Sequence, residues 1–260
     1  MTKVVAIIQA RMGSTRLPGK VMTEIVGKPM LWHLVDRVKK CRSVDLVVVA
    51  TTTNKEDRVV KELAEKSGAK AYCGSEDDVL DRYYQAAKLY GADVVVRITA
   101  DCPLIDPHLV DRMVKYFEDN RDKLDYVGMG SPNPYPDGLD AEVFSFKVLK
   151  KAWKETKLKS EREHVTPYIW KNEKLFRIGA VALDKDLSRF RWTVDEEKDL
   201  RFVREVYKHL YKEGQIFATE EILELLSRKP ELLDINQGIQ RNEGYAKSLK
   251  EDSFVKDGSD

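Results

Sequence analysis

The stretch that decides the fold lies near the start of the chain, where residues 4–20 read VVAIIQARMGSTRLPGK. Its first part, Val4–Ile8, is a continuous apolar run rich in β-branched residues, which is typical of a strand covered on both faces. Its second part holds two glycines, two hydroxyl residues and the three cations Arg11, Arg16 and Lys20. A turn of this composition directly after a buried strand predicts a phosphate-binding loop in an α/β protein.

Strand and helix signals alternate beyond this stretch. Residues 46–51 and 93–98 are further apolar runs, and apolar side chains recur at helical spacing over 30–38 and 59–64. We also expect helices over 79–90 and 107–117. This β-α-β-α order predicts an α/β fold with a doubly wound, mainly parallel sheet of Rossmann-like type, which binds ligands beyond the carboxyl ends of its strands.

The alternation breaks at residues 128–140, whose three prolines and three glycines predict a loop region. We expect an α+β insertion around it, at about residues 126–183, within a single domain that spans residues 1–246. Its expected elements are strands at 126–129, 142–146 and 176–183 and helices at 148–156 and 161–171. The expected elements after it are a strand at 191–194, helices at 199–211 and 220–227, and a frayed polar tail at 247–260.

Composition excludes several classes of protein. The 260 residues are 42% hydrophobic and 34% charged, as in a globular protein, and 45 Lys and Arg nearly balance 44 Asp and Glu. We therefore expect neither nucleic acid nor a membrane as a partner, since no overall positive field would attract them. No apolar run approaches the ~20 residues of a membrane span. The three cysteines form no C-x-x-C pair, which favours a reducing cytoplasmic location over a disulfide framework or a zinc site.

The cations of residues 11–20 suit a triphosphate, because arginine offers a two-pronged donor and lysine a point charge. The spacing is neither that of a Walker loop nor the G-x-G-x-x-G of dinucleotide-binding folds. A solvated basic turn is the alternative interpretation.

Two aspartates are candidate metal ligands. Asp101 follows the 93–98 strand, and Asp195 follows the expected strand at 191–194. Carboxylates at separate strand ends suit Mg²⁺, which takes one or two protein oxygens and completes its shell with water and phosphate. Ordinary turn or helix-cap aspartates are the alternative. Asp106 and Asp137 could substitute, although Asp106 precedes Pro107 and is better explained as a helix cap.

Four segments together carry a resemblance to a known family. They are residues 7–20 with Gly27-Lys28-Pro29-Met30, residues 97–104 (RITADCPL), residues 138–144 (GLDAEVF) with 162–168 (REHVTPY), and Thr193-Val194-Asp195 with Asp199-Leu200. This set resembles the cytidylyltransferases that make CMP-3-deoxy-manno-octulosonate and CMP-sialic acid, and above all the spore-coat polysaccharide biosynthesis protein F group. Thr99-Ala100 stands where the octulosonate enzymes usually have Gln-Gly, which leaves the base preference and the acceptor open.

The resemblance implies a nucleotidyltransferase fold, a Mg²⁺ cofactor, and transfer of CMP from CTP to an acidic sugar-like acceptor. It implies a homodimer formed through the insertion. The catalytic residues would be Arg11, Arg16, Lys20 and Asp101, and the metal ligands Asp101 and Asp195. The nucleotide would contact Gln9, Ala10, Arg11, Gly13, Ser14, Arg16, Lys20, Thr52, Thr99 and Ala100. The resemblance places Arg82 near the nucleotide or the sugar. Glu142, Glu163 and His164 of the insertion are candidate acceptor contacts by residue type, since a carboxylate beside an imidazole can move a hydroxyl proton, and a structural role is the alternative.

Two other functions stay open from the sequence. One is a pyrophosphorylase acting on a sugar 1-phosphate, although such enzymes usually have consecutive glycines where this chain has Ala10-Arg11. The other is a non-catalytic nucleotide-binding or assembly protein with the same fold. The presence of both aspartates and all three cations argues against it.

Overall fold

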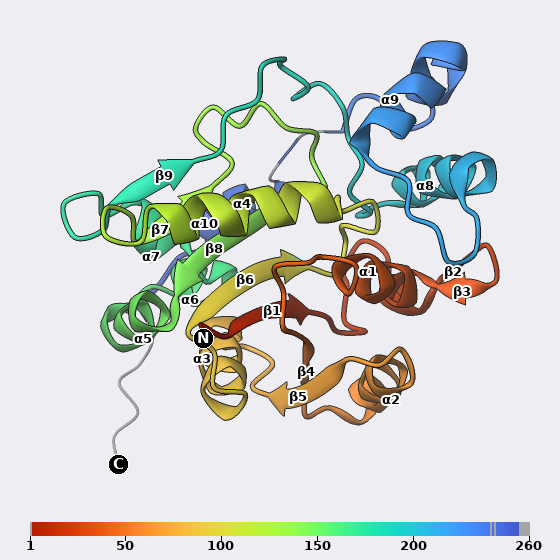
Figure 1. Cartoon of the computed structure of the whole chain (residues 1–260). Helices are drawn as coiled ribbons and strands as arrows, with labels where there is room; N and C mark the ends of the chain where they lie inside the picture. The colour runs from red at the N-terminus through yellow and green to blue at the C-terminus, as the bar shows by residue number, and fades with distance from the viewer. Residues whose placement is uncertain (1, 240, 242, 255–260) are drawn as a thin grey trace.

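A single mixed sheet forms the centre of the molecule (Figure 1). The computed structural model describes residues 2–239, 241 and 243–254, and within them the sheet has seven strands in the order β5-β4-β1-β6-β8-β7-β9. The strands are β1 (Val4–Gln9), β4 (Leu46–Thr52), β5 (Lys70–Gly74), β6 (Val94–Thr99), β7 (Tyr126–Gly128), β8 (Ala141–Ser145) and β9 (Ile178–Ala180). Only β8 runs antiparallel to its neighbours in this described sheet. The predicted mainly parallel α/β fold is confirmed.

The central strand β1 shows why helices cover both faces of the sheet. Val4, Ala6 and Ile8 pack into one hydrophobic cluster, whereas Val5 and Ile7 pack into another. Successive side chains of a strand point to opposite faces, so a continuous apolar run requires two covering layers.

The covering helices divide between these two clusters. The first cluster includes side chains from α1 (Met30–Val38), α2 (Arg58–Lys66), α4 (Pro107–Asp119), α8 (Glu197–Leu210) and α9 (Thr219–Arg228). The second includes side chains from α3 (Val79–Leu89), α5 (Phe146–Glu155) and α7 (Pro167–Trp170). The remaining described elements are α6 (Lys159–His164), α10 (Glu243–Lys250), the hairpin strands β2 (Glu24–Ile25) and β3 (Lys28–Pro29), and the 3₁₀ turns η1 (Lys20–Met22), η2 (Lys55–Asp57) and η3 (Pro230–Asp234).

Strand register brings the carboxyl ends of three strands to one edge. Gln9 at the end of β1 pairs with Ala50 of β4 on one side and with Thr99 of β6 on the other. The loops that begin at Ala10, Thr53 and Ala100 therefore start side by side, and this edge holds the candidate site. Among the described residues, each helix is too short or too polar to cross a bilayer.

Several sequence-based expectations were wrong in detail. The edge strand β5 was missed, because its sequence KAYCG lacks a β-branched run and its side chains are only partly buried. The expected helix at 161–171 is divided into α6 and α7 at Val165, whose φ is 72°. Pro167 has no backbone N–H to donate to the carbonyl of Glu163, so one continuous helix would lack that hydrogen bond.

The last third of the chain also differs from expectation. Residues 191–194 form no strand but an extended segment with one bridge, between Arg191 and Asp137. The expected frayed tail is helical in α10 as far as Lys250 and is bonded beyond it, since Ser160 donates to Asp252. The last six residues of the expected tail, 255–260, lie outside the described part of the chain.

The strands of the expected insertion lie in the main sheet. β8 pairs with β6, β7 pairs with β8, and β9 lies at the sheet edge beside β7 (Figure 1). Residues 126–183 therefore extend the central sheet and add α5, α6 and α7 to one end of it.

Candidate functional site

The loop after β1 is held in shape by its own backbone. The carbonyl of Met12 accepts hydrogen bonds from the N–H groups of Ser14 at 2.9 Å and Gly19 at 3.0 Å. Gly19 has a φ of 72°, in the left-handed region that favours glycine. The N–H of Met12 donates to the carboxylate of Asp57 at 2.6 Å, which fastens the loop to the neighbouring strand end. The cationic side chains of this loop therefore extend from a fixed backbone.

Lys20 lies between the two candidate metal ligands. Its Nζ is 3.0 Å from Asp195 Oδ1 and 3.5 Å from Asp101 Oδ2, and it donates to the carbonyl of Val194 at 2.7 Å. Burial by itself would lower the pKa of Lys20, but the charges of Asp101 and Asp195 outweigh it and raise this pKa. Burial would likewise raise the pKa of Asp101, but Lys20 and hydrogen bonds from Thr99 and Cys102 lower it. The structure thus brings both aspartates to one cation.

A close contact between two loops places Asp195 beside Asp101. The N–H of Val194 donates to the carbonyl of Asp101 at 2.8 Å, and the hydroxyl of Thr193 donates to the same oxygen at 3.1 Å. A Cβ at Gly138 would lie 2.4 Å from the nitrogen of Thr193, and Gly138 has a φ of 106°. A larger residue at this position would push the 192–195 segment away, so the glycine of the 138–144 motif supports the site.

The three cations of the loop reach different acidic partners. Arg16 is 3.0 Å from Asp195 and 3.1 Å from Glu243, whereas Arg11 is 3.2 Å from Glu76. Arg16 and Lys20 therefore both pair with Asp195, whereas Arg11 pairs with Glu76 in the loop between β5 and α3. Sequence reasoning did not identify Glu243 or Glu76 as partners of the loop.

Arg191 organises the acidic side of the site and was missed by sequence reasoning. Its guanidinium is 2.9 Å from Asp137, 3.1 Å from Asp195 and 2.9 Å from Asp199. The four-residue spacing from Arg191 to Asp195 and again to Asp199 was the available signal. Burial and the charge of Asp140 raise the pKa of Asp137 to about 6, although Arg241 and Arg191 oppose this rise. Arg191 therefore holds three carboxylates of the acidic side around one guanidinium.

The donor set fits a divalent cation. Two carboxylate oxygens already converge on the ammonium of Lys20, so a cation is the favoured occupant between Asp101 and Asp195. Among the described residues, no three or more His, Cys, Asp or Glu side chains are grouped to hold a metal ion. Two protein oxygens completed by water and phosphate are what Mg²⁺ uses in nucleotide sites, and this chain offers that pair.

The other expected nucleotide contacts lie at the same sheet edge. The N–H of Ala10 donates to the carbonyl of Ala50, and that of Ala100 donates to the carbonyl of Gln9. The hydroxyl of Thr52 is held by Asp57. Gly13 is open, since a Cβ there would come no closer than 3.8 Å to another group. These residues therefore line the sheet edge next to the loop, with the N–H groups of Ala10 and Ala100 already bonded to neighbouring strands.

Arg82 of α3 is a buried cation with unused donors. Only 2% of the residue is exposed, and its guanidinium donates to the carbonyl of Ser75 at 3.0 Å. Its Nε has no acceptor, and no carboxylate of the described chain lies within ion-pair distance of it. Burial lowers its pKa, and the nearby charge of Arg11 contributes. An anionic ligand bound near Arg11 would compensate the buried charge of Arg82.

The expected acceptor residues divide into two groups. Glu142 of β8 accepts hydrogen bonds from Arg97, from Tyr126 at 2.5 Å and from Thr166 at 2.7 Å, so it anchors the turn after α6 to the sheet. Sequence reasoning missed these three partners. His164 and Glu163 instead face α10, where both contact Ser248.

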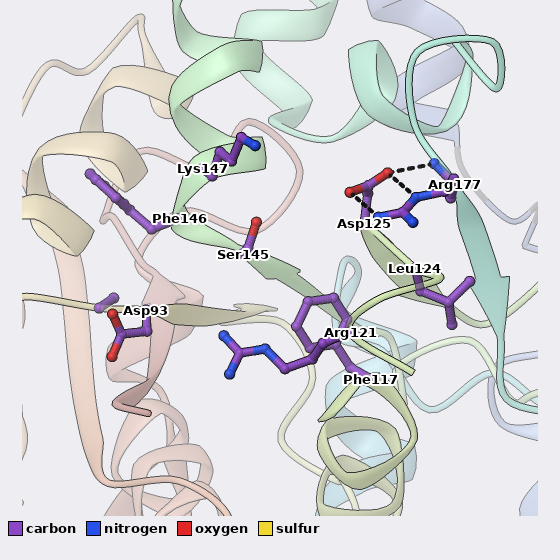
Figure 2. A pocket seen from close by; sticks show the side chains of 10 residues that line it. Asp93, Phe117, Arg121, Leu124, Asp125, Ser145, Phe146, Lys147 and Arg177 are labelled. Carbon is purple, nitrogen blue, oxygen red and sulfur yellow. Dashed lines mark hydrogen bonds and ion pairs between the residues drawn. The ribbon is translucent and has the colours of Figure 1, made fainter. Parts of the chain in front are cut away.

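A cavity of about 480 Å³ lies at the opposite end of the sheet (Figure 2). Asp93 precedes β6, Asp125 precedes β7 and Arg177 precedes β9, so this cavity is at the amino ends of parallel strands. Arg177 makes a two-pronged contact with Asp125, at 2.9 Å and 3.1 Å, as Figure 2 shows. Ligands of such sheets bind beyond the carboxyl ends of the strands, so the loop edge and not this cavity is the candidate site.

Known proteins similar to this chain identify its family. The model of the cytidylyltransferase family matches residues 5–243, which include the loop, both aspartates and Arg191. The chain belongs to the cytidylyltransferase family.

Two relatives and one solved structure show how far the similarity extends. An uncharacterized protein of Methanocaldococcus jannaschii is 40% identical over 92% of this chain and 96% of its own length. The spore coat polysaccharide biosynthesis protein SpsF of Bacillus subtilis is 30% identical over 89% of this chain and 97% of its own length. The structure of a cytidylyltransferase from Leptospira borgpetersenii has a TM-score of 0.87 at 33% identity and covers 93% of this chain and 100% of its own. The chain is thus similar to these proteins over nearly its whole length.

Proposed function

We propose that this member of the family transfers CMP from CTP to an acidic sugar or a related acceptor, with release of pyrophosphate, in the synthesis of a surface polysaccharide or glycoconjugate. The observation that carries the proposal is the convergence of Asp101 and Asp195 on Lys20 at the end of a phosphate-binding type of loop. The family supports the cytidylyl group as the part transferred. The similarity to a spore coat polysaccharide protein supports a sugar-like acceptor.

The nucleotide would lie along the sheet edge. The backbone N–H of Gly13, the hydroxyl of Ser14 and the cations Arg11, Arg16 and Lys20 would bind the β- and γ-phosphates. Gln9, Ala10, Thr52, Thr99 and Ala100 would face the nucleoside. Arg82 would use its free donors on the nucleotide or the sugar.

The reaction would be an in-line displacement. An oxygen of the acceptor forms a bond to the α-phosphorus, the bond to the oxygen that bridges to the β-phosphate breaks, pyrophosphate leaves, and the hydroxyl proton passes to water. Mg²⁺ bound by Asp101 and Asp195 would neutralise phosphate charge and lower the pKa of the attacking hydroxyl. Lys20 and Arg16 would stabilise the negative charge that grows on the leaving pyrophosphate. The protein acts mainly through position and charge.

The acceptor would lie toward residues 142–166, with Glu163 and His164 among its contacts and Glu142 fixing the turn that carries them. We also propose a homodimer formed through residues 126–183. Gel filtration with light scattering would test this point: a monomer at micromolar concentration would contradict it.

A screen of the four nucleoside triphosphates against sugar acids and neutral sugars, read out as pyrophosphate release, tests the proposed reaction. We expect release with CTP and a sugar acid and none without the acceptor. Asp101→Asn serves as the inactive control. Release with a sugar 1-phosphate instead would make the protein a pyrophosphorylase.

A further inference from the structure

The last described part of the chain packs against the helix that carries Glu163 and His164. We define the C-terminal segment as Arg241 and residues 243–254. Arg241 fastens one end, since it lies 3.0 Å from Asp140 and donates to the carbonyl of Tyr135 at 2.9 Å. Asp252 fastens the other, accepting from the N–H and hydroxyl of Ser160 at 3.0 Å and 2.6 Å. Between these anchors α10 packs against α6.

Ser248 of this segment stands between a carboxylate and an imidazole. Its Oγ lies 2.8 Å from Glu163 Oε2, 3.0 Å from His164 Nε2 and 3.0 Å from the carbonyl of Gly244. A serine hydroxyl has one proton to donate. The carboxylate is the shortest contact and the charged acceptor, so the proton of Ser248 points to Glu163.

This assignment fixes the protons of His164. Because the Ser248 hydroxyl donates its hydrogen bond to Glu163, its oxygen can only accept a hydrogen bond from His164. Nε2 of His164 must therefore carry a hydrogen. Burial lowers the pKa of His164, although the charge of Glu163 opposes this, and the ring is therefore neutral at pH 7. A neutral ring with a proton on Nε2 has an unprotonated Nδ1 that can accept a hydrogen bond.

The ring of His164 is also held sterically. Tyr245 of α10 packs edge-on against it at 4.9 Å between ring centroids, and Trp170 packs edge-on against Tyr245 at 5.9 Å. Val165, the next residue, has a φ of 72°, a strained value for a β-branched residue, and the turn is anchored through Thr166 to Glu142. The ring of His164 is therefore held from α10 and its turn from β8.

We infer that Ser248 and Tyr245 are positioning residues of the acceptor site, which hold His164 as the Nε2-protonated form with Nδ1 free to accept a hydrogen bond from a hydroxyl of a sugar-like acceptor. The acceptor part of this inference rests on the proposed function. The proton assignment does not, because it follows from the contacts of Ser248 and the burial of His164.

Nitrogen-15 NMR of the full chain labelled at histidine tests the assignment directly, since long-range couplings show which ring nitrogen carries the proton. The sequence has four histidines, and His164→Gln identifies the resonances of His164. At pH 7 we expect the Nε2-protonated form in the wild type, a mixture of both forms in Ser248→Ala, and recovery in Ser248→Thr. A wild-type proton on Nδ1 would overturn the inference.

Steady-state kinetics test the positioning role. Ser248→Ala should raise the KM for the acceptor roughly fivefold to tenfold, because a neutral hydrogen bond is lost, while the KM for CTP stays within twofold. Ser248→Thr should restore it, and Ser253→Ala, an exposed serine of the same segment, should change neither value. An unchanged acceptor KM in Ser248→Ala would refute positioning. Absence of wild-type turnover with any acceptor would instead overturn the proposed function, and the NMR measurement would still decide the proton assignment.

Discussion

Replacing Lys20 with methionine is the change that probes the candidate metal site without any need for turnover. Methionine keeps an unbranched side chain of similar length but removes the charge between Asp101 and Asp195. Among the described residues, Lys20 is the cation that ion-pairs with Asp101, whereas Asp195 keeps Arg16 and Arg191. Asp101 would then be a half-buried carboxylate with only neutral donors.

The magnitude follows from this asymmetry. Removing one partner of a buried pair costs about 3–5 kcal/mol. The side chains of Lys20 and Asp101 are 12% and 28% exposed, and only one of the two aspartates loses its last cation. At pH 7 without metal, we therefore expect the free energy of unfolding of Lys20→Met to lie about 2–3 kcal/mol below that of the wild type. This loss is smaller than for a fully buried pair.

The pH dependence has a definite sign. In the wild type the pKa of Asp101 is lowered, so its stabilising contribution is present above the unfolded-state pKa and is lost as the pH falls through the folded pKa. In Lys20→Met, burial would instead raise the pKa of Asp101, so the carboxylate destabilises the fold at neutral pH and is neutralised on acidification. The difference in the free energy of unfolding between the wild type and Lys20→Met should be largest at pH 7 and smaller near pH 4.

Urea unfolding followed by circular dichroism at pH 4 and pH 7, with and without Mg²⁺, measures all of these quantities. Mg²⁺ should raise the stability of Lys20→Met more than that of the wild type, because it can replace the missing charge between the carboxylates. Lys66→Met, at an exposed position of α2, is the matched control. Equal stability of Lys20→Met and wild type at pH 7, or a Mg²⁺ response no larger than that of the control, would refute the reasoning.

The remaining predictions concern the nucleotide and the metal ligands. Arg16→Ala should weaken CTP binding at least tenfold in calorimetric titration, since a charge-assisted contact to phosphate is lost. Glu243→Gln should tighten CTP binding roughly twofold to fivefold, because it removes an exposed carboxylate that competes for Arg16. Equal affinities in the wild type and both variants would contradict both predictions. CTP with Mg²⁺ should raise the melting temperature more than ATP, GTP or UTP at equal concentration, and a larger shift with another nucleotide would overturn the base assignment. Asp101→Asn and Asp195→Asn should each abolish most single-turnover activity, with the double variant little worse, and near-normal rates at saturating Mg²⁺ in either would exclude that residue as a ligand. Asp195→Asn should also be the less stable of the two, because Asp195 pairs with Arg16, Lys20 and Arg191.

The sequence predicted the sheet well where strands are buried on both faces. Val4–Ile8 and residues 46–51 and 93–98 correspond to β1, β4 and β6, because continuous β-branched runs have few other structures in which to be buried. Strand β5 was missed, since an edge strand needs no such run. Pro167 was present in the sequence as a signal against one helix over 161–171, and it was overlooked.

The site was predicted only in part. Parallel strand ends meet at one edge, so the approach of Asp101 to the loop could be expected, and the structure brings Asp195 there as well. The roles of both aspartates stay predictions. Arg241 and Ser248 act through partners far away in sequence, so no local periodicity indicates them, whereas the four-residue spacing from Arg191 to Asp195 was a signal that was overlooked. The extended segment 191–194 is fixed by loop contacts instead of a strand pairing.

The most direct test of the central claim is to incubate the purified protein with CTP, Mg²⁺ and a panel of sugar acids and to identify the products by mass spectrometry and phosphorus-31 NMR. We predict a phosphodiester that joins CMP to one acceptor, formed in equal amount with pyrophosphate by the wild type and absent with Asp101→Asn. A CMP conjugate formed equally by Asp101→Asn, or no conjugate with any acid while a sugar 1-phosphate yields a nucleoside diphosphate sugar, would contradict the account.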